Sequence, residues 1–151
     1  MSDVVIRPVG QQDHEQWGRL FRGYREFYEL EPSDEVVERV WGWLHDPAAE
    51  VFAFVADRDG RLVGLAHYRR FLRPSAGATG IYLDDLFTDP GVRGGGVGRA
   101  LVLRIADLAA EEGASVVRWI TAEDNARARR LYDSLAAATH WVTYDLRPGG
   151  E

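Results

Sequence analysis

The stretch "DPGVRGGGVGRALV", residues 89–102, joins a run of glycines to the start of an amphipathic segment. Residues 94–96 are consecutive glycines and Gly98 follows, although a glycine in regular structure costs about 0.5–1 kcal/mol relative to alanine. The preceding "IYLDDLFT", residues 81–88, predicts a strand. A glycine-rich loop between a strand and a helix is a typical anion-binding site. The N–H groups at a helix N-terminus point toward the ligand, and the helix dipole favours negative charge there. The sequence therefore predicts an anion site at this loop.

Spacing separates the ligands that such a loop could hold. A Walker loop ends in a lysine, and residues 89–102 contain none. A Rossmann fingerprint requires glycine or alanine five positions after its first glycine, which neither Gly94 nor Gly96 provides. The register that remains is R-x-x-G-x-G, matched by Arg93, Gly96 and Gly98. On these residues alone, a flexible glycine-rich turn without a ligand stays open as the alternative.

The R-x-x-G-x-G register resembles the acetyl-coenzyme A loop of the GNAT N-acetyltransferase superfamily, in which backbone amides hold the pyrophosphate of the cofactor. A second motif follows in "TAEDNARARRLYDSLA", residues 121–136. There Asn125, Ala128, Leu131 and Tyr132 resemble the asparagine and the A-x-x-L-Y helix of that family. Two separate motifs in the right order make the resemblance much more specific than the loop alone.

The N-terminal region and two departures refine the resemblance. "VVIRPVGQQDHEQW" and "GYREFYE", residues 4–17 and 23–29, look most like the histone and polyamine acetyltransferase branch. Gly95 stands where a basic or polar residue is common, so one charged contact to phosphate is expected to be absent. "LAAATHWVTY", residues 135–144, replaces a Gly-Phe pair that turns many relatives into their last strand. The form of that last turn is therefore left open.

Alternation and helical spacing predict the element order β-α-α-β-β-β-α-β-α-β. Ser33 is expected to cap the second helix, residues 57–60 to form a hairpin turn, and Gly113 to end the third helix. The resemblance implies an α/β (mixed α+β) GNAT-like fold, with a central mixed, mostly antiparallel sheet of about six to seven strands flanked by about four helices. The expected strands are residues 3–9, 51–56, 61–71, 81–88, 115–121 and 140–146, and the expected helices are residues 12–28, 33–44, 99–112 and 125–136.

Length and composition indicate one domain, residues 1–147, with a frayed tail at 148–151. The chain has 151 residues, no cysteine and a net charge of -6. These values exclude disulfides and thiolate chemistry and argue against a protein that coats nucleic acid. The N-terminus has no apolar segment of signal-peptide length, and no apolar run is long enough to cross a membrane. We therefore expect a cytoplasmic protein that binds neither nucleic acid nor membrane.

Acetyl transfer from a thioester requires a neutral amine, yet a lysine-like ammonium titrates near ~10.4. Asp84 and Asp85 lie on the strand that enters the loop, and relatives often carry an acidic base at this point. Successive strand residues face opposite sides, so only one of the two is expected to point into a given pocket. We favour Asp84 over Asp85, acting directly or through water; an exposed carboxylate or an ion-pair partner is the alternative.

Tyr132 is the expected general acid, because a phenol with a pKa near ~10 can protonate a departing thiolate. Its helix also has an apolar face, so a plain core tyrosine is the alternative. Asn125 can cap that helix and also bond the pantetheine arm. The resemblance implies that the cofactor contacts the end of the strand, the loop and the later helix, namely Leu86, Phe87, Thr88, Arg93, Gly94, Gly95, Gly96, Val97, Gly98, Arg99, Asn125 and Ala128.

The acceptor pocket of this superfamily is usually built from the first two helices, a region that is rich in acids here. Glu26 and Glu29 are the candidates to attract a cationic amine, with ordinary surface charge as the alternative, and His67 is a candidate for the pocket wall. The acceptor can be a small-molecule amine, such as a polyamine or diamine, or a protein lysine. A homodimer is implied by the resemblance alone. The histidines lack metal-ligand spacing, so no metal is expected.

A second class of function remains beside the enzyme. A non-catalytic acyl-coenzyme A binding module would keep the glycine loop and lose turnover. Such a module needs neither Tyr132 nor the pair Asp84 and Asp85, so their presence favours the acetyltransferase.

Overall fold

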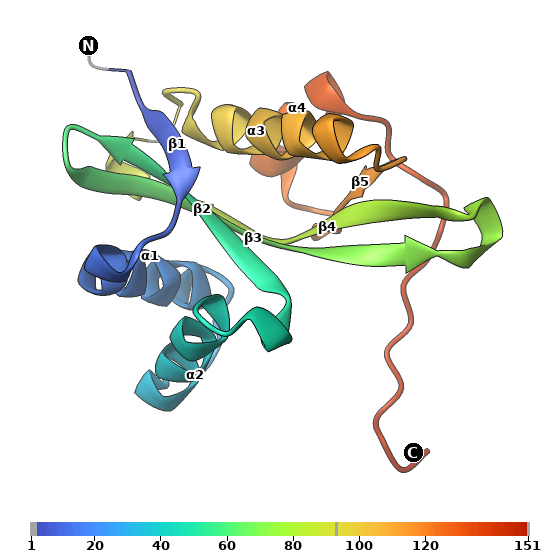
Figure 1. Ribbon diagram of the computed structural model, residues 1–151, viewed down its shortest axis with the longest axis horizontal. Coiled ribbons are helices and arrows are strands. Elements are labelled where there is room, and N and C mark those ends of the chain that lie inside the picture. The colour runs from blue at the N-terminus through green and yellow to red at the C-terminus, as the bar shows by residue number, and fades with distance from the viewer. Residues whose placement is uncertain (1–2, 93, 151) are drawn as a thin grey trace. The chain divides into compact units, whose positions relative to one another are not determined.

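The structure, a computed structural model, describes residues 3–92 and 94–150. It divides into two compact units, the first ending at Ile120 and the second beginning at Thr121. The first unit holds one β-sheet and three α-helices, and the second holds the helix α4 (Ala126–Leu135) (Figure 1). Among the described helices, none is long and apolar enough to span a membrane.

The sheet of the first unit has five strands in the order β1-β2-β3-β4-β5. The first four pair antiparallel, and β5 joins β4 in parallel, so the sheet is mixed and mostly antiparallel as expected. Asp59 and Gly60 connect β2 to β3 with φ values of 54° and 89°, as the expected hairpin turn requires. The strands are β1 (Val5–Pro8), β2 (Val51–Arg58), β3 (Arg61–Arg73), β4 (Ala78–Thr88) and β5 (Val117–Arg118).

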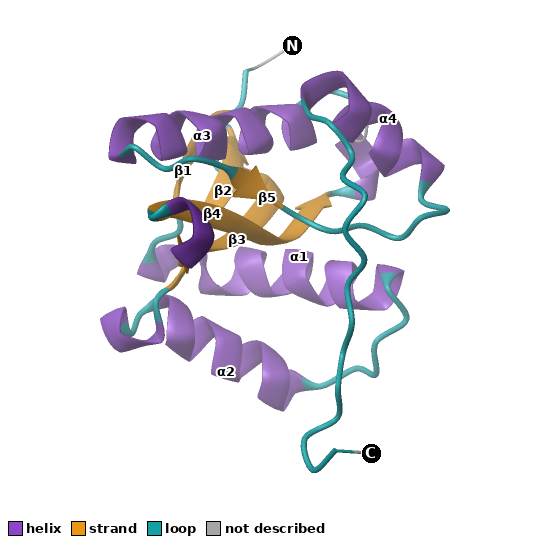
Figure 2. Cartoon of the chain, turned by 90° about the vertical axis from the view of Figure 1, so that its right-hand side faces the viewer, coloured by secondary structure: helices purple, strands orange, loops and turns teal. Residues whose placement is uncertain are grey.

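Helices cover both faces of this sheet (Figure 2). The helices α1 (His14–Phe27) and α2 (Asp34–Leu44) lie on one face, and α3 (Val97–Glu112) lies on the other. The Ser33 hydroxyl accepts from the Val36 N–H and caps α2, as predicted. Gly113, at φ 72°, ends α3 in the left-handed conformation that glycine adopts without strain.

The core between α1, α2 and the sheet fixes where α1 stands relative to β4. Trp17 and Leu20 of α1 are buried against Leu65 of β3 and Phe87 of β4. Full burial of such side chains contributes about 1.5–3 kcal/mol each. The polar groups of α1 that follow the same helical face, such as Tyr24, are thereby brought to the end of β4.

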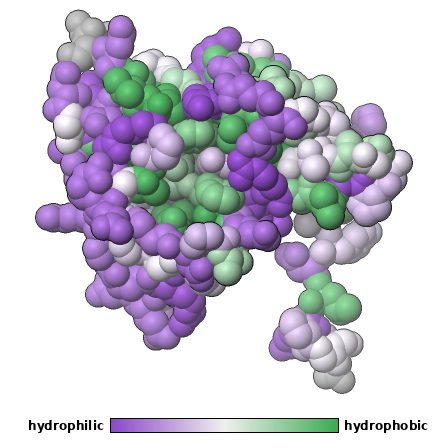
Figure 3. Space-filling view, viewed as in Figure 1, coloured by the Kyte–Doolittle hydropathy of each residue, from purple (hydrophilic) through white to green (hydrophobic). Residues whose placement is uncertain are grey.

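The predicted fold class is confirmed, but the number of strands is lower than expected. The segment 115–121 forms a strand only at Val117–Arg118, and the strand expected at 140–146 is absent from the described structure. A strand needs a partner, and the described part of the second unit offers one helix and no other strand. The large side chains of this tail are therefore exposed, Trp141 at 87% and Tyr144 at 90% among them. Figure 3 shows green, hydrophobic residues on the surface of the tail.

Candidate active site

The glycine loop forms the N-terminus of α3. Gly94 and Gly96 have φ values of 89° and 82°, a region that side-chain-bearing residues rarely adopt. Among the described residues, no atom lies within 4 Å of a Cβ placed on either glycine. The helical ladder starts with the Ala100 N–H, which donates to the Gly96 carbonyl, so the amides of the first turn precede it. Arg93, the first residue of the motif, lies outside the described residues.

Asp89 anchors the start of this loop to the rest of the first unit. Its carboxylate accepts from the Gly91 N–H at 3.0 Å, from Arg19 at 3.0 Å and from Arg61 at 3.1 Å. The bond from Gly91, with those from the two guanidinium groups, holds the pKa of Asp89 below its ordinary value. The Asp89 carboxylate therefore ties the loop to α1 through Arg19 and to β3 through Arg61.

Arg58, the last residue of β2, places a further cation beside the loop. Its Nη2 lies 4.0 Å from the position that a Cβ on Gly95 would take. Its Nε is buried and has no hydrogen-bond partner within the described residues. The Arg58 guanidinium therefore lies beside Gly95, a loop position that has no charged side chain of its own.

A β-bulge in β4 positions the two predicted carboxylates. His67 of β3 pairs with Asp85, but Tyr68 pairs with Leu83, so Asp84 is the extra residue. The parallel pairing of β5 with β4 covers only Ile81 and Tyr82, and β4 continues past it to Thr88. The predicted main-chain contacts Leu86, Phe87 and Thr88 thus lie in the part of β4 beyond its pairing with β5.

The bulge gives Asp84 and Asp85 different surroundings. Asp84 bonds to Arg69 Nε at 3.0 Å; burial raises the pKa of Asp84, the charge of Asp85 adds to this, and Arg69 offsets part of it. Asp85 accepts from His67 at 2.8 Å and interacts with the Tyr24 hydroxyl. Burial opposes the charge of Asp85, but these two donors hold its pKa below the ordinary value. One carboxyl is thus kept ionised, and its neighbour binds a proton more readily.

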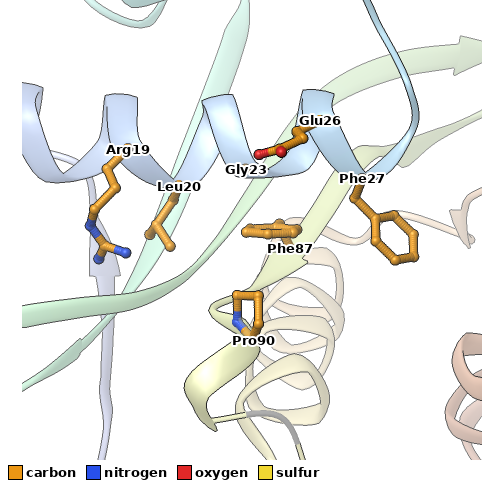
Figure 4. Close-up of a pocket in the computed structure, with 7 residues that line it drawn as sticks. All are labelled: Arg19, Leu20, Gly23, Glu26, Phe27, Phe87 and Pro90. Carbon is orange, nitrogen blue, oxygen red and sulfur yellow. The ribbon is translucent and has the colours of Figure 1, made fainter.

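A hollow of about 260 Å³ lies between α1 and the end of β4 (Figure 4). Phe87 and Pro90 face α1 across it, and Glu26 brings a carboxylate to its rim. The described lining includes Glu26 but neither Glu29 nor His67. It consists of Arg19, Leu20, Gly23, Glu26, Phe27, Phe87 and Pro90.

The other two substrate candidates have different environments. Glu29 follows the end of α1 with a φ of 58° and is exposed. His67 is 2% exposed, and both of its ring nitrogens are hydrogen-bonded.

The second unit contains the remaining predicted residues. The Asn125 side chain accepts from the Ala128 N–H at 3.3 Å and caps α4, as the sequence suggested. Tyr132 lies in the middle of that helix. Its role as an acid, and the contact of Asn125 and Ala128 with the cofactor, stay predictions.

Sequence reasoning missed Trp17, Tyr24 and Arg69 as polar groups around Asp84 and Asp85. It also missed Arg19 as a partner of Asp89. Trp17 is buried in the core, and its indole N–H also bonds to His67. Residue spacing in the sequence indicates part of this arrangement. Trp17 and Tyr24 are seven residues apart and therefore share one face of their helix. His67 and Arg69 are two residues apart and therefore share one face of their strand.

Comparisons with known proteins agree with this geometry. The Acetyltransferase (GNAT) family matches residues 17–136. The D-amino-acid N-acetyltransferase HPA3 of Saccharomyces cerevisiae is 29% identical over 93% of this chain and 89% of its own length. The thialysine N-epsilon-acetyltransferase of Bos taurus is 29% identical over 91% of this chain and 85% of its own. The ribosomal-protein-alanine N-acetyltransferase of Brucella melitensis has a solved structure with a TM-score of 0.81 and 27% identity, covering 97% of this chain and 99% of that one. The family expected from the two sequence motifs is confirmed.

Proposed function

Since the chain belongs to the acetyltransferase (GNAT) family and is an N-acetyltransferase, we propose that it moves the acetyl group of acetyl-coenzyme A to a primary amine by direct attack. The amine nitrogen forms a bond to the thioester carbonyl carbon, and the carbon–sulfur bond breaks. The amine loses a proton to a base, and the departing thiolate gains one from an acid. The observation that carries the proposal is the glycine loop at the N-terminus of α3, which follows the strand β4 that carries the carboxylate pair.

The loop binds the pyrophosphate of acetyl-coenzyme A. The positive φ values and the open space in front of Gly94 and Gly96 let phosphate oxygens approach the backbone. Val97, Gly98 and Arg99 supply first-turn amides, and Arg58 supplies a charge that Gly95 lacks. The main chain of Leu86–Thr88 binds the pantetheine arm as an added strand.

Asp84 is the base, directly or through one water, with Asp85 as the second candidate. Its raised pKa brings its proton affinity closer to that of the amine, which favours general base catalysis near neutral pH. Asp85 is held ionised by His67 and Tyr24, so it is the weaker base of the two.

Tyr132 is the general acid that protonates the thiolate of coenzyme A. A phenol, with a pKa near ~10, carries its proton at neutral pH and can donate it to the alkylthiolate as the carbon–sulfur bond breaks. Asn125 and Ala128 at the start of the same helix contact the pantetheine arm.

The hollow beside α1 receives the acceptor. Glu26 attracts a cationic amine, and Phe27 and Phe87 provide an apolar wall for the carbon chain that bears it. Two relatives are named for amino-acid substrates, a D-amino acid and thialysine. A small molecule with a side-chain or α-amine is therefore the first acceptor to test, ahead of a protein lysine.

The test is release of free coenzyme A thiol in the presence of a panel of amines. We expect turnover with cationic amines and slower turnover with neutral or anionic acceptors. Binding of acetyl-coenzyme A without turnover of any amine would instead favour a non-catalytic binding module. Light scattering on the same sample tests the proposed homodimer.

A further inference from the structure

A chain of hydrogen bonds runs through the core from α1 to the bulge of β4. The indole N–H of Trp17 donates to Nε2 of His67 at 3.0 Å, and Nδ1 of His67 bonds to the Asp85 carboxylate at 2.8 Å. Trp17 is fully buried, and His67 is 2% exposed. The ring of Phe21 meets His67 edge-on at 5.0 Å between centroids, so the imidazole is also fixed by packing.

The direction of these bonds assigns the tautomer of His67. An indole nitrogen only donates, so Nε2 of His67 must be the unprotonated acceptor. The single ring proton is then on Nδ1 and is donated to Asp85. The contact between His67 and Asp85 is therefore a hydrogen bond from a neutral ring to a carboxylate. A second proton on the ring would break the bond to Trp17.

Asp85 is surrounded by groups from three elements. Tyr24 faces it from α1, His67 from β3, and Asp84 from β4, while Arg69 of β3 bonds to Asp84. The two donors Tyr24 and His67 are both uncharged, so they stabilise the negative charge of Asp85 without neutralising it. The charge of Asp85 thus acts on Asp84 and on any cation that enters between α1 and β4.

We propose that Trp17 and His67 are positioning residues for acetyl transfer, which hold Asp85 as a fixed anion at the bulge so that the acceptor ammonium is drawn to Asp84. This inference rests on the proposed function and adds the residues that control its charge. In the first step, the paired carboxylates attract the ammonium. In the second, Asp84 takes the proton, and Asp85 stays ionised because the neutral imidazole keeps donating to it.

Substitution of His67 separates this role from a purely structural one. His67→Leu fills the core but removes the donor to Asp85, whereas His67→Asn keeps a side-chain N–H at the place of Nδ1. A hydrogen bond to a charged group changes an equilibrium about ten- to a hundredfold, so the titration of Asp85 is expected to move up by about one to two pH units in His67→Leu. His67→Asn is expected to stay near the wild type.

Carboxyl-detected NMR titration measures this shift without any need for activity. Nitrogen spectra of the wild type should show one His67 tautomer, protonated on Nδ1, and Trp17→Phe should abolish that preference. An Asp85 midpoint unchanged in folded His67→Leu, or a wild-type ring protonated on Nε2, would overturn the proposal.

The pH profile of kcat/KM then tests the catalytic consequence. Its acid limb should move to higher pH in His67→Leu and should be restored in His67→Asn, while the affinity for acetyl-coenzyme A stays unchanged. His14→Asn is the matched control, because His14 bonds to the exposed Glu38 and, among the described residues, makes no hydrogen bond to Asp84 or Asp85.

The outcomes distinguish this inference from the proposed function. If His67→Leu moves the Asp85 titration and leaves the rate profile in place, the positioning role is refuted and the transferase stands. If the wild type acetylates no amine, the proposed function and the catalytic part of the inference fail together, and the titration of Asp85 alone decides whether the chain of bonds holds the anion.

Discussion

Gly96 and Gly113 offer a matched pair for testing the glycine loop, because they flank the same helix. Each lies in the left-handed region, with φ values of 82° and 72°, and no described atom lies within 4 Å of a Cβ placed on either. Replacement by alanine therefore creates no clash at either end. The free energy of unfolding should fall by about 1–2 kcal/mol in both variants, because alanine adopts this left-handed backbone conformation less easily than glycine.

Binding is expected to separate the two variants. In Gly96→Ala the new methyl group occupies open space in front of the loop amides, where phosphate is proposed to bind. Loss of one charge-assisted bond weakens binding by about 1.5–3 kcal/mol, which is roughly ten- to a hundredfold in Kd. Gly113→Ala lies at the other end of α3, and its affinity should stay at the wild-type value.

Calorimetric titration with acetyl-coenzyme A measures the affinities, and thermal unfolding confirms that both variants are folded and equally destabilised. Equal affinity of the two variants, with similar melting temperatures, would refute the assignment of the loop. A loss of affinity shared by both would point to helix stability rather than to phosphate contact.

Three further predictions concern the chemistry and the acceptor. Tyr132→Phe should lower kcat by roughly 10²–10⁴ and leave acetyl-coenzyme A affinity nearly unchanged; full activity with chemistry rate-limiting would end the general-acid role. Glu26→Gln should raise KM for a cationic amine about tenfold, whereas Glu29→Gln, outside the lining of the hollow, should not; steady-state kinetics with one amine decides this. Arg69→Gln removes the cation that offsets burial at Asp84, so the pKa of Asp84 rises further and the acid limb of kcat/KM moves to higher pH. An acid limb of kcat/KM that does not move would mean that a residue other than Asp84 is the base.

Elements with a local chemical signal were predicted well. Ser33 caps α2 because its hydroxyl reaches an N–H three residues on, and Gly113 ends α3 because it tolerates positive φ. The turn at Asp59 and Gly60 has the same kind of local cause. Each of these features depends on residues close in sequence, so no knowledge of the packed structure was needed.

Features that depend on distant partners were predicted poorly. The tail at 140–146 has the composition of a strand, but pairing is decided by a neighbour, and no strand accompanies it in the described part of its unit. Likewise, Trp17 and His67 are fifty residues apart, and only packing brings the indole to the imidazole. Trp17 is buried on the apolar face of α1, but an apolar helical face gives no indication of this hydrogen bond.

The bulge explains why two adjacent aspartates occur on β4, which strand alternation alone could not. In a regular strand, Asp84 and Asp85 would point to opposite faces of the sheet, and one carboxylate would be buried under α3 without a known partner. The extra residue re-aims the strand, so that Asp84 bonds to Arg69 while Asp85 bonds to His67, two residues apart on β3. Both charges then act on Tyr24 of α1, whose pKa is raised by burial first and then by each carboxylate. Different residues thus stabilise the two carboxylates, a cation at Asp84 and neutral donors at Asp85. The charge of Asp85 also raises the pKa of Asp84, so the pair divides into a base and a neighbouring anion.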